Sequence, residues 1–552
     1  MIRSIEKKTG TYADALEAIG WATLLQELGV KKLRIHDEGT CFVLRGEGEP
    51  DFTLPASLGF CFVSDAKNPR PEIADWAIDY ERERSKEEAQ REFEKAVKKK
   101  AKGVTRAAEA GELEAPDRPS PELKLAKMVS SMRKGWNADR DLAVWIGEHP
   151  EMTTGWIEAT FEARSFKDAP DLSNTQLLNP STGKGVSAAK TQAKAPNSVP
   201  GVLMDPFAEW MKLRGMWQGL IAYRSDEDFK FMVIEPGGIS PGDLKMLREA
   251  LEALNLWGGI RLDIEATLKL TRLLVEYSDV RRESGGVSLR GTRPGRVVRG
   301  LRQAYFKSLG TAAALMNEAL LPLPEWFDVQ SRTDADVYLR IIDETVGDKV
   351  RGGCLGILDE EKSDDGAVLQ QYRAWLGSGD FEDLMEFHYQ FGALGLRKAA
   401  AGEFTRQFRS ETLDELLVRT YEETHMLKEI IEDEGFRSIA RAIRNTTIYA
   451  VGMKSSNREI QFGLAQKWKQ KMHGDEGEFA AALADFVQAN NWEVAHKLEG
   501  KGFQVSATHL DSVFGLIEKH GEEKVGSLLL AYGYSRAPKV DDEVQQAEQV
   551  QS

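Results

Sequence analysis

The chain has 552 residues, of which 41% are hydrophobic and 29% are charged, a composition typical of globular proteins with buried cores. No apolar run reaches the roughly 18 residues that a membrane-spanning helix needs, and the first residues lack the apolar block of a secretory signal. Cys41, Cys61 and Cys354 form no CxxC pair, so we expect neither a disulfide framework nor a zinc site. We expect a cytoplasmic chain of about three domains with no membrane partner.

The net charge of −15 conceals two strongly basic segments. Residues 281–308 contain seven arginines and one lysine against one glutamate, and residues 436–474 contain four arginines and four lysines against one glutamate. Each segment therefore carries +7, and the rest of the chain carries −29. Such a distribution is typical of a protein that binds a polyanion at chosen places, since its acidic surface disfavours binding elsewhere.

The first 115 residues predict a mixed α/β domain. Thr11 is a good N-cap for the helix that the apolar spacing of the following residues predicts. Residues 31–47 alternate as in a β-hairpin that turns at the sequence Asp-Glu-Gly. Residues 72–112, rich in Glu, Lys, Arg and Ala, predict a long solvated helix, and the acidic, proline-containing segment 111–122 then indicates a domain boundary.

A second domain is expected over residues 116–379, again mixed α/β. Residues 217–238 predict two strands around a Ser-Asp-Glu-Asp turn, and residues 243–255 predict a helix. The acidic residues near the turn, and Asp263 with Glu265, have no His, Cys or further acid at ligand spacing. We therefore interpret them as turn and surface residues and expect no metal site.

From Asp380 onward the chain predicts a helical bundle. Seven successive segments have helical spacing, separated by short breaks that often contain glycine. The bundle is expected to span residues 380–538, followed by an acidic, Gln-rich, disordered tail over 539–552. The predicted fold class is thus α+β and predominantly helical, with a mixed N-terminal and central region followed by a C-terminal bundle.

The segment LNPSTGKGVSAAK, residues 178–190, resembles a phosphate-binding loop without meeting its rule. A Walker loop needs a glycine five positions before its Gly-Lys pair and Ser or Thr after the lysine, whereas Leu178 and Gly185 occupy these positions. The histidines form no catalytic or metal-binding motif. We therefore expect no catalytic machinery and no cofactor, and a nucleotide-dependent enzyme is the less favoured alternative.

The same segment has features of a loop that holds a nucleic-acid backbone. Between residues 174 and 199 there are lysines but no acidic residue. Glycines on either side of a lysine allow a phosphate to approach the backbone closely, and an asparagine amide can pair with a base edge. The alternative is a flexible solvated linker. The residues predicted to bind nucleic acid here are Asn179, Gly183, Lys184, Gly185 and Lys190.

In the first basic segment, arginines recur at every third position. The glycines and the proline between them disfavour a helix, so we expect a mobile loop leading into a helix at about Val297. Arginines in such a loop can form forked hydrogen bonds with phosphates, and an ordinary solvated loop is the alternative. The predicted contacts are Arg290, Arg293, Arg296 and Arg299.

The second basic segment predicts two helices whose cations lie opposite their apolar residues. The apolar residues would face a bundle core, and the cations of both helices would form a strip that follows a nucleic-acid backbone independently of sequence. A merely solvated face is the alternative, which the near absence of acidic residues disfavours. The predicted contacts are Arg437, Arg441, Arg444, Lys467 and Lys471.

Three blocks of the sequence resemble the large subunit of type I CRISPR interference complexes (Cascade), closest to the I-A/I-B kind. They are KTGTYADALEAIG near the start, LNPSTGKGVSAAK in the middle, and GFRSIARAIRNTTIYA, GLAQKWKQK and EFAAALADFVQANN near the end. The resemblance touches both ends and the centre of the chain, and the C-terminal block is its most specific part. No HNH-type nuclease insert is visible, so the resemblance is to the non-cutting form.

The resemblance implies a non-catalytic role in antiviral defence. Such subunits bind the 5′ end of the guide RNA, recognise the protospacer-adjacent motif of the target double-stranded DNA and stabilise the R-loop with its displaced single strand. Their partners are the other Cascade subunits and a separate helicase–nuclease, and their C-terminal bundle resembles the small subunit of the complex. A scaffold that binds only proteins through its basic surfaces is a further alternative.

Overall fold

The fold is seen in a computed structural model of the chain. It describes residues 1–53, 62–64, 77–101, 115–120, 122–131, 133–170, 177–180, 205–225, 228–282, 286–289, 292–309, 313–324, 328–348, 352–421, 424–452, 459–498 and 502–537. Over these residues the protein is α+β and predominantly helical, which confirms the predicted fold class.

The chain forms two compact units, each assembled from two segments. The first contains residues 1–257 and 295–321, and the second contains residues 258–294 and 322–552. The boundaries expected near 115 and 379 lie within these units. Composition could not indicate this arrangement, because the return of 295–321 to the first unit depends on strand pairing between distant segments.

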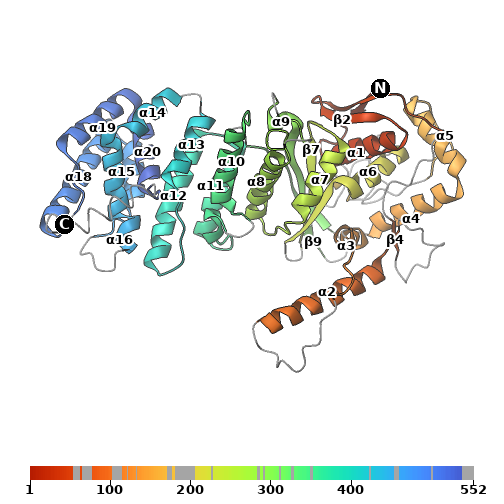
Figure 1. Ribbon diagram of the computed structural model, residues 1–552, viewed down its shortest axis with the longest axis horizontal. Coiled ribbons are helices and arrows are strands. Elements are labelled where there is room, and N and C mark those ends of the chain that lie inside the picture. The colour runs from red at the N-terminus through yellow and green to blue at the C-terminus, as the bar shows by residue number, and fades with distance from the viewer. Residues whose placement is uncertain are drawn as a thin grey trace. The chain divides into compact units, whose positions relative to one another are not determined.

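The first unit contains two four-stranded antiparallel sheets (Figure 1). The predicted hairpin is confirmed as β2 and β3, and the two predicted central strands are confirmed as β6 and β7. The first sheet has the order β1 (Ile2–Glu6), β3 (Cys41–Glu47), β2 (Lys31–Asp37) and β8 (Gly238–Ile239). The second has the order β10 (Ala313–Pro322), β9 (Val298–Ser308), β7 (Asp228–Pro236) and β6 (Leu220–Ser225).

The core of this unit contains two helices, α1 (Tyr12–Glu27) and α6 (Pro206–Gly219), that cross at backbone contact. Both are buried on nearly every side, so α1 is more enclosed than its predicted apolar face implied. A Cβ atom at Gly20 would lie 1.9 Å from the carbonyl oxygen of Met211, and one at Gly215 would lie 1.9 Å from that of Leu16. Glycine is therefore required at both positions of the crossing.

Further helices surround this core. The long charged helix is observed as α2, but it begins only at Tyr80, because the residues before it form the short strand β5, which pairs in parallel with β4. The predicted central helix is confirmed as α7. The remaining elements of the unit are β4 (Phe62–Ser64), β5 (Ala77–Asp79), α2 (Tyr80–Ala101), α3 (Leu123–Ser131), α4 (Arg133–Glu148), α5 (Pro150–Phe161), α7 (Pro241–Glu252) and the single turn α9 (Pro294–Val297).

The second unit is helical (Figure 1), and its C-terminal part confirms the predicted bundle. One predicted helix, over 410–432, is instead two helices, α13 and α14, and the expected tail lies outside the described residues. The elements are α8 (Ile260–Glu276), α10 (Arg332–Val346), a 3-10 turn (Cys354–Ile357), α11 (Ser363–Ser378), α12 (Phe381–Ala400), α13 (Ser410–Thr420), α14 (Thr424–Glu432), α15 (Glu434–Thr446), α16 (Ile448–Gly452), α17 (Leu464–Met472), α18 (Glu478–His496), α19 (Ala507–His520) and α20 (Glu522–Gly533).

Candidate nucleic-acid interface

The loop between β1 and α1 has the geometry of an anion-binding loop, but its own chain fills it. The backbone N–H groups of Lys8, Thr9 and Gly10 donate to the Asp14 carboxylate over 3.1, 3.1 and 2.7 Å. Thr11 caps α1 as predicted, with its side chain accepting from the N–H of Ala13. Because Asp14 occupies these donors, the loop has a fixed shape and does not offer them to a phosphate.

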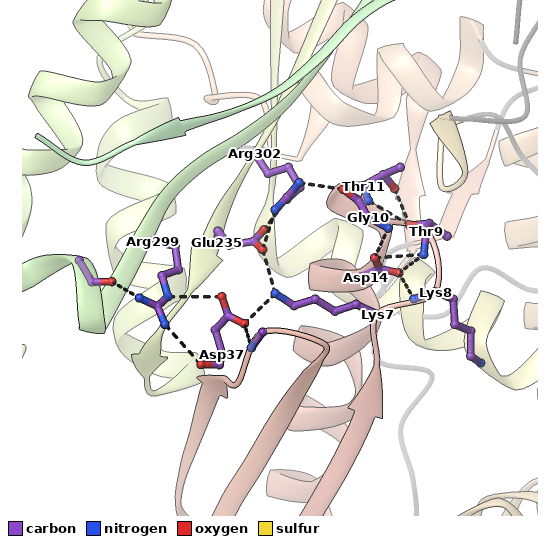
Figure 2. Close-up of polar contacts among 12 residues, drawn as sticks. Lys7, Lys8, Thr9, Gly10, Thr11, Asp14, Asp37, Glu235, Arg299 and Arg302 are labelled. Carbon is purple, nitrogen blue, oxygen red and sulfur yellow. Dashed lines mark hydrogen bonds and ion pairs between the residues drawn. The ribbon is translucent and has the colours of Figure 1, made fainter. Parts of the chain in front are cut away.

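A chain of alternating charges holds this loop against the sheets (Figure 2). Lys7 Nζ lies 2.7 Å from Asp37 and 3.5 Å from Glu235. Arg302 binds the same Glu235 at 2.9 Å and donates to the carbonyl oxygen of Gly10 over 2.7 Å. Burial alone would raise the pKa of Asp37, but hydrogen bonds from Lys7 and from the N–H of the following turn hold that pKa below its usual value. The network therefore alternates basic and acidic side chains that pair with one another.

This network corrects the interpretation of the first basic segment. The helix expected at about Val297 is wrong, because the single turn α9 leads directly into strand β9. Arg299 lies on that strand and pairs with Asp37 at 3.3 Å, so its charge is already partly neutralised although its side chain is 41% exposed. Arg293 and Arg296 are exposed, and no described residue forms an ion pair with them, whereas Arg290 lies outside the described residues.

The start of the central lysine loop is fixed in the protein interior. Asn179 is only 2% exposed; its amide donates to Glu209 Oε2 over 2.9 Å, and its carbonyl oxygen accepts from Lys212 Nζ over 2.8 Å. Lys212 also pairs with Glu209 at 2.8 Å. Both ends of the amide are thus used inside the protein, which corrects the expectation that Asn179 meets a base edge. Its position indicates that it anchors the loop.

Two further contacts define this anchor, which we call the loop stem and define as residues 177–180 and 205–212. The Tyr12 hydroxyl donates to the carbonyl oxygen of Leu177 over 2.6 Å, which joins the stem to α1. Asp205 caps α6 by accepting from the N–H of Phe207. The first block of the resemblance therefore contacts Leu177, the residue immediately before the second block. Gly183, Lys184, Gly185 and Lys190 lie between the two halves of the stem and outside the described residues.

Helix α1 carries a carboxyl group near the stem whose pKa is strongly raised. Burial raises the pKa of Glu17 from 4.5 to about 7, although the nearby Lys212 opposes this shift. Burial alone would lower the pKa of Lys212, but Glu209 and Glu17 raise it above its usual value. Lys212 therefore remains a cation and is the electrostatic centre of the stem.

In the second unit, α15 has the predicted amphipathic pattern, with one exception. Phe436, Ile439 and Ile443 are buried, and Arg437 is exposed. Arg441 is half-buried, with its guanidinium 4.3 Å from the ring centroid of Phe503. Arg444 points inward instead.

Arg444 is a structural residue, contrary to the predicted contact with single-stranded DNA. It is 7% exposed and donates to the carbonyl oxygens of Ser535 and Tyr532 over 2.6 and 2.9 Å. These carbonyls lie at the C-terminal end of α20, where a cation is favoured by the helix dipole. The helical spacing of Arg437, Arg441 and Arg444 is correct, but the last member of the row enters the core.

The lysines of α17 also differ in whether a carboxylate pairs with them. Lys467 is exposed, and no described residue forms an ion pair with it. Lys471 pairs with Glu478 at 2.9 Å, and Lys469 pairs with Glu386. The proposed strip on this helix is therefore smaller than predicted, since Lys471 is partly neutralised.

Some residues that organise these surfaces were not predicted. They are Asp14, Glu235, Arg302, Glu209 and Lys212. Asp14 accepts from backbone N–H groups four to six residues before it, whereas the others pair with residues that are distant in sequence or three positions away on a helix. Thr11 and Asp14 follow the S/T-x-x-D pattern of a helix start, so this part could have been found. The pairing of Arg302 with Glu235 depends on the register of β9 against β7 and has no local signal.

The described residues also offer a cleft of about 1080 Å³, between α2, α3 and α7. Most of the charged side chains that line this cleft form ion pairs with one another, for example Lys127 with Glu87 and Arg248 with Glu252. Within the described part of the chain, no group of three or more His, Cys, Asp or Glu side chains is placed to hold a metal ion. No helix in that part is both long and apolar enough to cross a membrane.

No protein-family model matches the chain, and no curated protein matches it either. The function proposed below is supported by the arrangement of the chain's own residues and by the resemblance of its three sequence blocks.

Proposed function

We propose that this chain is the non-catalytic large subunit of an RNA-guided type I CRISPR surveillance complex. In this role it binds the end of the guide RNA and the target DNA and recognises the protospacer-adjacent motif. It also stabilises the R-loop and recruits a separate helicase–nuclease. Base pairing with the guide supplies sequence specificity, so the protein needs to hold backbones and a short motif and performs no chemistry.

The loop stem is the observation that carries this proposal. Residues 181–204 contain three lysines and no acidic residue, and buried contacts fix the chain on both sides of them. A cationic loop held at its base by a rigid scaffold is a common way to position a binding segment. The Gly-Lys-Gly at its centre lets a phosphate approach the backbone and pair with one cation.

The second unit supplies a separate cationic surface. Arg437 and Lys467 are exposed, and Arg441 is held over an aromatic ring, on helices whose apolar residues form the bundle core. Cations on rigid helices can follow a single strand without reading its sequence. This surface is suited to the displaced strand, whereas the lysine loop is suited to the guide end or the duplex.

The proposal is tested by purifying the full chain with the products of its neighbouring genes and sequencing the RNA that accompanies it. We expect short RNAs with a common repeat-derived 5′ end and binding of a matched target DNA. An assembly that persists unchanged after nuclease treatment and contains no RNA would support a protein-only scaffold instead. ATP hydrolysis that disappears in Lys184→Ala would support the nucleotide-dependent enzyme.

The same variant tests the site within the complex. Lys184→Ala should weaken target binding and reduce the slope of log affinity against log salt by about 0.9, the value for one duplex phosphate contact. Lys245→Ala is the matched control, because this α7 lysine is 52% exposed and its nearest carboxylate oxygen is 3.9 Å away. Equal affinity and equal slope for both variants would reject the loop as a binding site.

A further inference from the structure

The C-terminal half of α18 exposes an aromatic residue on an uncharged surface. Trp492 is 56% exposed, although α18 buries its other large aromatic side chains in the bundle. The exposed residues between positions 488 and 496 are Gln488, Ala489, Trp492, Ala495 and His496. The one carboxylate in this stretch, Glu493, is buried and accepts from the N–H of Glu459 and from Lys497.

The indole of Trp492 is held in position by the next turn of the helix. The rings of Trp492 and His496 stack with centroids 4.9 Å apart and planes 20° apart. His496 Nδ1 lies 2.9 Å from the carbonyl oxygen of Trp492, which fixes the imidazole. An aromatic ring that is already ordered loses little conformational freedom when another flat group stacks on it.

A second stack, between a cation and an aromatic ring, is attached to the same stretch of α18. Asn490 donates to the carbonyl oxygen of Phe503 over 3.3 Å, and Asn491 exchanges two hydrogen bonds with the backbone of Val505. Arg441 of α15 lies over the ring of Phe503. The contacts of Asn490 and Asn491 therefore hold the segment that carries Phe503, and with it the Arg441–Phe503 pair, against α18.

We propose that Trp492 is a base-stacking residue for single-stranded nucleic acid, an inference that rests on the proposed function and adds base contacts to its backbone contacts. Aromatic platforms beside cations are the usual means of holding a single strand, because every base has a flat face and every nucleotide a phosphate. Residues 488–496 themselves expose no carboxylate, which favours an anionic strand over a basic protein segment at Trp492; the exposed acidic residues Asp485 and Glu459 adjoin the stretch.

The test compares two oligonucleotides of equal length with the full chain, one of thymidines and one of abasic sugar phosphates, by fluorescence anisotropy. Trp492→Ala should weaken binding of the thymidine strand roughly ten-fold and leave the abasic strand unaffected, since stacking is lost and phosphate contacts remain. Trp492→Phe should retain most of the affinity. Trp257→Ala, at a 72% exposed tryptophan elsewhere, is the matched control and should change neither.

The outcomes separate this inference from the function on which it rests. A wild-type chain that binds neither strand would overturn both. Binding of both strands, with thymidine affinity unchanged in Trp492→Ala, would reject base stacking and leave the proposed function standing. Loss of complex assembly in Trp492→Ala, with strand affinity unchanged, would place the indole in a protein interface and also overturn the inference. A uridine strand run in parallel distinguishes RNA from DNA as the occupant.

Discussion

Replacing Lys212 with methionine should strongly destabilise the loop stem. The side chains of Lys212 and Glu209 are 4% and 2% exposed, so the substitution leaves the Glu209 charge buried without its main partner. Asn179 loses the donor to its carbonyl oxygen as well. Breaking a buried pair in this way costs about 3–5 kcal/mol, and methionine preserves the length of the side chain, so the effect is not that of a cavity.

Two comparisons isolate the ion pair as the cause. Lys245→Met removes a surface lysine and should change stability by less than about 0.5 kcal/mol. Glu209→Gln combined with Lys212→Met should be less destabilised than the sum of the single changes, because the double variant buries no unpaired charge.

Hydrogen exchange of the α6 amides measures this effect locally, which avoids treating a chain of two units as two-state. The free energy of opening of α6 should fall by about 3–5 kcal/mol in Lys212→Met and remain unchanged in Lys245→Met. The affinity for nucleic acid should fall without a change in salt slope, since no phosphate contact is removed. Unchanged α6 protection, or strictly additive effects in the double variant, would refute the stem as a coupled unit.

Three other changes test the assignment of structural and binding roles. Glu17→Gln should remove a pH dependence. The pKa of Glu17 is about 7 in the folded state, above the usual 4.5, so the wild-type protein loses about 3 kcal/mol of stability as the pH rises through this range. Melting curves at a series of pH values would measure this loss. Gly20→Ala should cost about 3 kcal/mol or more in denaturant unfolding, because its Cβ meets a carbonyl oxygen, whereas Gly147→Ala, with no neighbour within 4 Å, should be neutral or stabilising. Arg444→Met should lower bundle stability by about 3 kcal/mol without altering the salt slope of single-strand binding. Arg437→Gln should reduce that slope by about 0.7 and lower stability by only about 1 kcal/mol, the value of its one hydrogen bond to the carbonyl oxygen of Ile431; the reverse result would exchange the two roles.

Local sequence signals predict elements well wherever their periodicity is complete within the element. The helix after Thr11, the hairpin over 31–47 and the C-terminal helices were predictable for this reason. Strand β9 was not, because Arg299 and Arg302 give it the charge pattern of an exposed loop. Their charges are neutralised by Asp37 and Glu235, which the sheet register brings to them from distant parts of the chain.

In the candidate site, too, local sequence signals predict some features and contacts with distant parts of the chain decide others. A row of cations at helical spacing indicates which residues share a helix face, but the direction of that face depends on neighbouring helices. Arg437 and Arg444 belong to one row, yet the end of α20 accepts two hydrogen bonds from Arg444, whereas Arg437 is exposed and donates to the carbonyl oxygen of Ile431. Charge patterns in the sequence therefore locate a basic surface, and packing decides which of its members remain available.

The number of cations that remain available determines how strongly nucleic-acid binding by the intact protein depends on salt. The sequence predicts eleven cations as nucleic-acid contacts, which would give a slope of about −10 for log affinity against log salt if each met a duplex phosphate. Arg299 and Lys471 are paired with carboxylates, and Arg444 is buried, so they release few counterions. The remaining cations limit the slope to about −7. A measured slope near −9 would mean that the pairs of Arg299 and Lys471 open when the strand binds, and variants of Asp37 and Glu478 would then leave the slope unchanged while raising affinity.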